Sequence, residues 1–337
     1  MNRTSAAVSK CLVGTLLLAA LPGVVCALAG AQAAERTEPA AAASEDRRPR
    51  ARVPKARRKP VAQARPAASA SIAQLEAADL AKRTASELEA LIARQRDVVR
   101  QSPRDETARR NLGLISMEAA NRVLDAQSMG RTQELSAYVS LIRNSLADTL
   151  WRVNQLTREF PARAQAALGL YYAEGILVPA DPVRGCEFFQ KAAESGHHAA
   201  AYRVSQCYQR SEPARARRWL EQSAGGGNPA AQETLGRACI EGASVDAACA
   251  KKWLEPAAAS GRVSAMSVLA WLYAREATPA TMARAADLYR AAAGAGDPAA
   301  QNNLGELYET GRGVAREASQ AFVWYRKSAE GGFGPAQ

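Results

Sequence analysis

The sequence predicts an all-α fold, a solenoid in which short helix pairs stack as repeats. The clearest pair lies at residues 296–332, where Pro298 suits the first turn of a helix and Leu304 and Tyr308 share one helical face. After a turn at Gly311, a second apolar stripe follows at helical spacing. One pair this short cannot bury both stripes alone, so it must stack on copies of itself.

Copies of this pair recur along the second half of the chain. A glycine precedes each first helix, at steps of 31, 34, 35 and 36 residues: Gly196, Gly227, Gly261, Gly296 and Gly332. An alanine follows each glycine four residues later, and one large side chain recurs in each second helix: Phe188, Trp219, Trp253, Leu288 and Trp324. Residues 160–337 are therefore predicted to hold five repeats and the start of a sixth.

The runs ALGLYYAEG and AAQNNLGELYETGRGVAREASQAFVWYRKSAEGG resemble the Sel-one-like repeat family, relatives of the tetratricopeptide repeats. The resemblance covers residues 160–337. It implies a right-handed superhelix whose concave face is lined by the first helices and binds proteins or organises envelope complexes. Two units depart from the pattern, because Ser205 replaces a glycine in the second unit and Glu276 stands at the turn glycine of the fourth.

Residues 1–33 have the pattern of an export signal. Arg3 and Lys10 precede an apolar run, and the triplet from 31 to 33 has the small-x-small form of a cleavage site. We interpret this segment as a cleaved signal, which predicts a periplasmic or secreted protein. Two alternatives are an uncleaved inner-membrane anchor formed by residues 11–30 and a lipid-modified Cys26.

Residues 34–70 are rich in Ala, Pro and Arg and have little to bury, so we expect a disordered linker. They carry a net charge of +6, the first 33 residues carry +2, and the whole chain carries +11, so the basic character belongs to the tail. Nucleic acid is not an expected partner, because the linker lacks aromatic side chains that stack on bases. The favoured interpretation of the linker is a solvated spacer, and the alternative is that it binds anionic lipid or an acidic cell-wall polymer.

Residues 71–159 are predicted to be helical, and Pro103 followed by Leu112 resembles a degenerate tetratricopeptide repeat. Helix starts are expected at four capping patterns: Ser71 with Gln74, Thr84 with Glu87, Ser102 with Asp105, and Thr132. The last of these helices is predicted to continue to Glu159.

Four cysteines follow the export signal: Cys186, Cys207, Cys239 and Cys249. Cys239 and Cys249 flank one turn, and antiparallel packing brings Cys186 and Cys207 to the same edge of the solenoid. Because an exported protein meets an oxidising compartment, we predict the disulfides Cys186–Cys207 and Cys239–Cys249. The alternative is four buried free thiols.

The sequence contains no pattern expected of an enzyme, a metal site or a cofactor site. His197 and His198 are the only histidines, and adjacent residues on a helix point about 100 degrees apart, which makes them a poor metal pair. The turn at residues 311–313 lacks the lysine and the preceding strand of a phosphate-binding loop. We therefore predict a non-enzymatic protein without a cofactor.

Partner binding is predicted on the groove side of the first helices. The column that holds Glu306 holds Leu170, Gln206, Arg237 and Trp271 in the other units and is expected to face away from the core. Trp271 is an aromatic anchor candidate on a polar stripe, although packing against a neighbouring unit explains it equally well. The predicted partner-binding residues are Trp271, Arg237, Gln206, Tyr202, Arg203, Glu306, Asn302 and Asn303.

The leading functional hypothesis is a scaffold of the bacterial cell envelope that binds another envelope protein. A second hypothesis is a cell-wall or polysaccharide binder that uses the basic linker and the groove, and a weaker one is a cell-wall hydrolase. The last helix carries Phe322, Val323, Trp324 and Tyr325, more apolar surface than one neighbouring helix covers. Self-association or partner docking is therefore also predicted at the C-terminal repeat.

Overall fold

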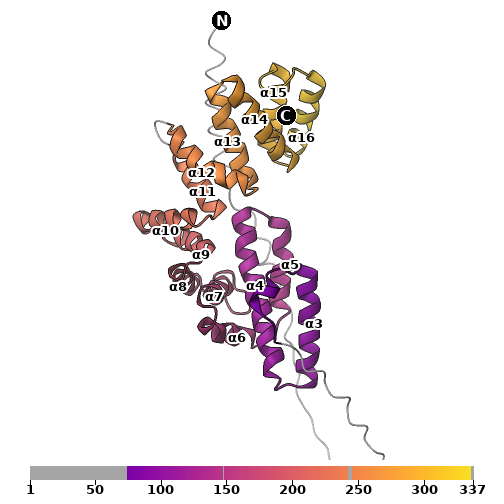
Figure 1. Ribbon diagram of the computed structural model, residues 1–337, viewed down its shortest axis with the longest axis vertical. Helices are drawn as coiled ribbons and strands as arrows, with labels where there is room; N and C mark the ends of the chain where they lie inside the picture. The colour runs from indigo at the N-terminus through magenta and orange to yellow at the C-terminus, as the bar shows by residue number, and fades with distance from the viewer. Residues whose placement is uncertain (1–73, 147, 242–244, 335–337) are drawn as a thin grey trace, which may run out of the picture. The chain divides into compact units, whose positions relative to one another are not determined.

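The computed structural model describes residues 74–146, 148–241 and 245–334. The predicted export signal (1–33) and linker (34–70) therefore lie outside the described residues. Within them the chain is helical and contains no strand, which confirms the predicted fold class (Figure 1). No helix of this described part is both long and apolar enough to span a membrane.

The helices before the repeats begin where local caps allow. They are α2 (Ala77–Leu80), α3 (Ala85–Gln101), α4 (Glu106–Met129), α5 (Thr132–Arg143), α6 (Thr149–Gln155) and the 3-10 turn η1 (Leu156–Arg158). Thr84 caps α3 as predicted, because its hydroxyl accepts from the Glu87 amide while the Glu87 carboxylate accepts from the Thr84 amide.

The predicted start of α4 is wrong in detail. Asp105, and not Ser102, caps α4, and its Oδ1 accepts from the amide of Ala108 at 2.8 Å. Residues 102–105 instead form a turn in which the Asp105 amide donates to the Ser102 carbonyl, as a proline at the second turn position favours. Ser71 lies outside the described residues, and the first described helix begins at Ala77.

The predicted long helix from Thr132 to Glu159 is also wrong. Thr132 is the first residue of α5 and not its cap, since the left-handed Gly130 ends α4 only two residues earlier. The helix then ends at Arg143, and the Ser145 hydroxyl donates to the carbonyl of Ile142. A serine that bonds the backbone in this way competes with the helical hydrogen-bond ladder, and the chain resumes as α6.

Five antiparallel helix pairs follow and form the repeats. Their bounds are α7 (Pro161–Glu174) and α8 (Pro182–Glu194), α9 (His198–Tyr208) and α10 (Pro213–Gly225), α11 (Pro229–Ala238) and α12 (Ala247–Ala259), α13 (Val263–Glu276) and α14 (Pro279–Gly294), α15 (Pro298–Thr310) and α16 (Ala318–Glu330). We call these pairs units one to five. Each helix packs on the next along the chain, so the repeat register predicted from the sequence matches the structure.

The recurring glycines have a backbone reason. Those at the ends of the second helices have φ between 83° and 92°, a left-handed conformation that side chains disfavour: Gly196, Gly227, Gly261, Gly296 and Gly332. The fourth unit meets the same need without glycine. Ala277 ends α13 with φ of 54°, where units one and five use Gly175 and Gly311.

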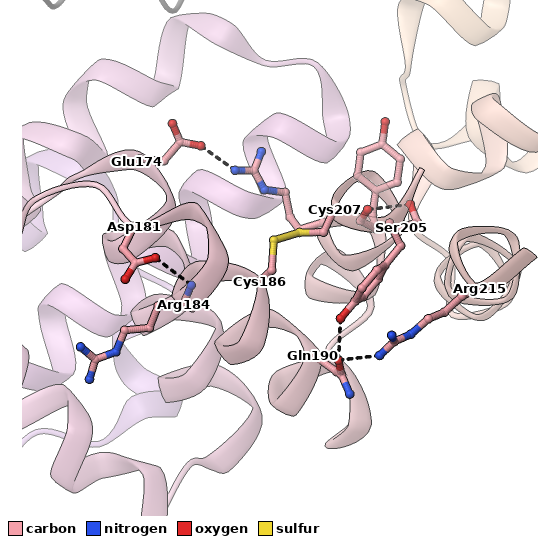
Figure 2. Close-up of a disulfide and its surroundings, with 11 residues drawn as sticks. Glu174, Asp181, Arg184, Cys186, Gln190, Ser205, Cys207 and Arg215 are labelled. Atoms are coloured by element: carbon pink, nitrogen blue, oxygen red, sulfur yellow. Dashed lines mark hydrogen bonds and ion pairs between the residues drawn. A yellow bond between two sulfur atoms is a disulfide. The ribbon is translucent and has the colours of Figure 1, made fainter. Parts of the chain in front are cut away.

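The cysteines pair as the sequence predicts, and Figure 2 shows the first of the two disulfides, Cys186–Cys207. The Cys186–Cys207 disulfide joins α8 to α9, and therefore unit one to unit two. The Cys239–Cys249 disulfide closes the turn between α11 and α12. From the lengths of the chain loops that they close, 21 and 10 residues, each stabilises the fold by about 3 kcal/mol.

Polar contacts on either side of the first disulfide also join units one and two. Arg203 of α9 pairs with Glu174 of α7 at 2.6 Å. On the other side, the Gln190 side chain of α8 accepts from the hydroxyl of Tyr208 and from the guanidinium of Arg215 (Figure 2). The disulfide therefore lies within a continuous set of inter-unit contacts.

The left-handed alanine gives a stability prediction. Ala277→Gly removes the strain of a side chain at positive φ, and we expect it to raise the free energy of unfolding by about 1 kcal/mol. Gly311→Ala introduces the same strain at the matching position of unit five and should lower it by a similar amount. Urea denaturation measures both. A change of the same sign in the free energy of unfolding for both substitutions would contradict the prediction.

Candidate functional site

Helix α4 lies along the repeat array and contacts the first helices α7, α9 and α11 (Figure 1). Sixteen of its 24 residues are buried, far more than the two of 13 in the outer helix α16. Its side chains belong to the same hydrophobic cluster as those of α7, α8 and α9. The chain therefore supplies its own helix to the groove face of the first units.

A row of polar contacts fixes α4 against units one and two. The Asn121 amide donates to the carbonyl of Arg163 at 3.1 Å, and Glu118 forms an ion pair with the Arg163 guanidinium. The His197 ring caps α9, since its Nδ1 accepts from the Ala200 amide at 3.1 Å. Its Nε2 therefore carries the proton and donates to Asn121 Oδ1 at 2.7 Å.

The same row continues onto units three and four. The side-chain amide of Asn228 donates to the Ser128 hydroxyl at 2.8 Å, in a buried contact between residues 100 positions apart. The Arg262 guanidinium donates to the Ser128 carbonyl at 2.8 Å. His197, Asn228 and Arg262 are the N-cap residues of α9, α11 and α13, so α4 contacts one equivalent position in each successive unit.

The predicted groove column changes from covered to open along the array. Leu170 of unit one is fully buried, so the expectation that it faces an open groove is wrong; it lies in the hydrophobic cluster that α4 completes. Gln206 of unit two is exposed, and Arg237, Trp271 and Glu306 of units three to five are half-buried. The partly exposed residues Arg237, Trp271, Asn302 and Glu306 lie on the first helices α11, α13 and α15, and we call this predicted binding surface the open groove.

A charged cluster lies at the covered end of the open groove. Glu233 is buried, and its carboxylate accepts from Arg237, Arg262 and the Ser264 hydroxyl. Burial opposes its ionisation, but Arg262, Ser264 and Arg237 outweigh burial and lower the pKa of Glu233. This end of the groove therefore holds an ionised carboxylate whose charge is balanced by Arg262 and Arg237. The ion pair with Glu233 also fixes the position of Arg237.

The sequence left two roles open for Trp271, an anchor for a partner and packing against a neighbouring unit, and its position fits both. Its ring packs against the hydrophobic cluster formed by α12 to α15, and the Arg275 guanidinium lies over the ring at 4.8 Å from its centre. The ring nevertheless remains half-buried rather than buried. Part of an indole that is held in place by packing is thus available at the middle of the open groove.

The other predicted partner-binding residues divide between surface and interior. Tyr202 is half-buried and packs beside α11, and Arg203 is held by its pair with Glu174. Asn302 is half-buried on α15. Asn303 lies beneath the surface, 9% exposed, and forms a hydrogen bond with Tyr289.

A pocket of about 630 Å³ lies beside α4, and nothing in the sequence pattern indicated it. Its wall combines the turn between α2 and α3, residues of α4 and α5, and the turns that begin units two and three: Arg83, Arg122, Asp125, Tyr138, His197 and Asn228. Loss of surrounding water and the charge of Glu118 raise the pKa of the Asp125 carboxyl. Because α4 meets the repeats only through contacts distant in sequence, no local signal could have located this pocket.

His197 is the most strongly shifted titratable group of the pocket. Burial, together with the positive charges of Arg163 and His198, lowers its pKa from 6.5 to about 4. The ring is therefore neutral at pH 7, as its role as a hydrogen-bond acceptor at the start of α9 requires. Within the described residues, no group of three or more His, Cys, Asp or Glu side chains is arranged to hold a metal ion.

Comparison with known families identifies the repeats. The Sel1 repeat family matches residues 162–197, 198–228, 229–261 and 298–333. The chain thus carries Sel1 repeats within residues 162–333. The segment between the third and fourth matches is unit four, in which Glu276 and Ala277 stand in place of the turn glycine. Proteins of this family generally act as scaffolds for protein–protein interaction.

The chain is also similar to solved structures, one of which shares its fold at a TM-score of 0.50. A Sel1 repeat protein from Oxalobacter formigenes is 21% identical with a TM-score of 0.50, and the match covers 63% of this chain and 84% of that protein. A protective antigen of uropathogenic Escherichia coli strains that displays an SLR fold is 22% identical with a TM-score of 0.48. That match covers 74% of this chain but only 62% of the antigen. No curated protein matched the chain.

The shifted pKa of His197 gives a pH prediction. Because the folded pKa lies below the unfolded value, the stability due to the neutral ring is present above pH 6.5 and is lost as pH falls toward 4. A shift from 6.5 to about 4 corresponds to about 3 kcal/mol in total. Denaturation at pH 7 and pH 5 measures the slope, which is the change in the free energy of unfolding with pH. Both pH values lie above the range in which most carboxylates titrate.

His197→Asn is the informative variant, because Asn228 shows that asparagine caps the next first helix. We expect this variant to flatten the slope between pH 7 and pH 5 while it retains the cap. His198→Asn is the matched control: it removes only the smaller effect of the His198 charge, so burial and Arg163 should keep most of the slope in place. If the free energy of unfolding of His197→Asn changes between pH 7 and pH 5 as much as that of the wild type, the pH dependence is not due to His197.

Proposed function

We propose that this protein is a non-enzymatic scaffold of the bacterial cell envelope that binds a partner protein through the open groove. The support is a comparison between units. In unit one the groove column holds Leu170, which is apolar and covered in the cluster that includes α4. In units three to five the same column holds Arg237, Trp271 and Glu306, which remain partly exposed.

A docking role accounts for the residue types of the open groove. Aromatic and arginine side chains are the usual anchors of protein interfaces, because they bury a large area at a small entropic cost. Trp271 is held against its own cluster and stacked with Arg275 before any partner arrives. Binding would therefore require little further ordering of this anchor.

An envelope location is supported by the cysteines and by the N-terminal sequence pattern. Disulfides persist in oxidising compartments such as the periplasm, and both cysteine pairs of the repeat region are at bonding distance. The apolar run and small-x-small triplet before residue 34 have the form of an export signal. Together these features favour a protein that acts outside the cytoplasm.

The experiment places a photoreactive amino acid at Arg275, which is exposed beside Trp271, in cells that express the full chain. We expect a crosslinked protein partner that mass spectrometry identifies. Trp271→Ala should reduce this adduct at least tenfold, because a central anchor contributes about 2 kcal/mol or more to binding.

Trp151→Ala is the matched control. Trp151 is 54% exposed outside the repeats, and it too carries an arginine stacked on its ring, Arg152 at 4.4 Å. This variant should leave the adduct unchanged, and both variants should keep wild-type helicity. An adduct that survives Trp271→Ala, or the absence of any protein adduct at Arg275, would contradict the proposed groove.

A further inference from the structure

Helix α4 provides a template for what the groove accepts. Its anchors for units two and three are Asn121 and Ser128, which bond the N-cap residues His197 and Asn228. The two anchors are seven residues apart, and both are short polar side chains. One heptad of the inserted helix therefore corresponds to one repeat of the array.

This correspondence has a geometric cause. Seven residues advance an α-helix by about 10.5 Å and return the side chain to nearly the same side of the helix. This advance matches the step from unit two to unit three, because Asn121 bonds the N-cap His197 and Ser128, seven residues later, bonds the N-cap Asn228. A straight helix laid across the repeats can thus bond the short N-cap side chains of successive units with anchors that recur every seven residues, whereas the longer Arg262 reaches back to the carbonyl of Ser128.

The row of N-cap residues continues beyond the end of α4. Gly130 ends this helix in the left-handed conformation, after Ser128 has bonded unit three and its carbonyl has accepted from Arg262 of unit four. The next member of the row is Asp297, the half-exposed N-cap of α15. Its Oδ1 accepts from the amides of Ala299 and Ala300, and its Oδ2 accepts from the Ser267 hydroxyl.

Asp297 retains acceptor capacity for a ligand. A carboxylate offers about four lone-pair sites, and three are used by the bonds just described. A hydroxyl or amide N–H placed as Ser128 is placed on unit three would find an acceptor there. Glu306 adds a second negative charge on the same helix, which favours a Lys or Arg on whatever docks.

We propose that the partner element of the open groove is an α-helix that carries Ser, Thr or Asn at seven-residue spacing, with a basic residue toward Glu306. It extends the line of α4 across units four and five and covers the exposed part of Trp271. This inference rests on the proposed function and specifies the kind of partner. Short polar anchors are required because they let the helix axis approach the first helices closely, as Asn121 and Ser128 do for α4.

The test uses a labelled synthetic peptide with the sequence of α4, residues 106–129, and the full-length protein. Fluorescence anisotropy should detect saturable binding of this peptide to the wild-type chain and to Trp151→Ala. Binding to Trp271→Ala should be at least tenfold weaker, which would locate the peptide in the open groove and not at the position of the chain's own α4.

The spacing is tested by inserting one alanine into the peptide. An insertion between Leu124 and Asp125 moves the second anchor to eight-residue spacing and turns it by about 100 degrees, so binding should fall at least tenfold. An insertion between Ala108 and Arg109 gives a peptide of the same composition with the spacing preserved, and it should bind as the parent does.

Two results would overturn the inference: no binding of the parent peptide, or equal binding of both inserted peptides. Either result leaves the crosslinking experiment at Arg275 unaffected. A protein adduct that depends on Trp271, combined with indifference to peptide spacing, would retain the proposed function and reject the helical partner. Loss of that adduct would instead reject the proposed function itself.

Discussion

The packing of α4 along the first helices is the contact on which the rest of the molecule depends. The helix is buried around most of its circumference, so it must satisfy its polar side chains within the protein. It does so through Glu118, Asn121 and Ser128, whose partners lie in four successive units. The helical region before the repeats therefore shares one hydrophobic interior with units one and two, and polar contacts join it to units three and four.

This contact divides the groove face of the array into two parts with different chemistry. Where α4 covers it, the column residue is Leu170, and burial contributes hydrophobic free energy. From unit two onward the column is not buried and holds Gln206, Arg237, Trp271 and Glu306, which suit contact with water and with a partner. The disulfide between α8 and α9 and the ion pair of Arg203 with Glu174 keep the covered units in register.

Much of the fold is predictable from sequence because the same residue pattern recurs at equivalent positions in several units. The left-handed glycines, the fully buried alanines one turn later and the cysteine pairs all follow from recurring columns. The single-copy region is harder: the cap of α4 is Asp105 and not Ser102, and the helix from Thr132 breaks after Arg143. The covered groove and the pocket depend on contacts such as Asn121 with His197, 76 residues apart, which no local pattern encodes. Trp271 was identifiable because it is the one indole in a polar column.

A double-mutant cycle between Ser128 and Asn228 tests the central contact most directly. Asn228→Ala alone also removes the cap of α11, but the cycle subtracts this effect, because the cap is lost whether or not Ser128 is present. If α4 packs on unit three as described, unfolding free energies of the two single variants and the double variant should give a coupling of about 1 kcal/mol. A coupling below about 0.3 kcal/mol would mean that the two groups do not interact and would contradict the placement of α4 in the groove.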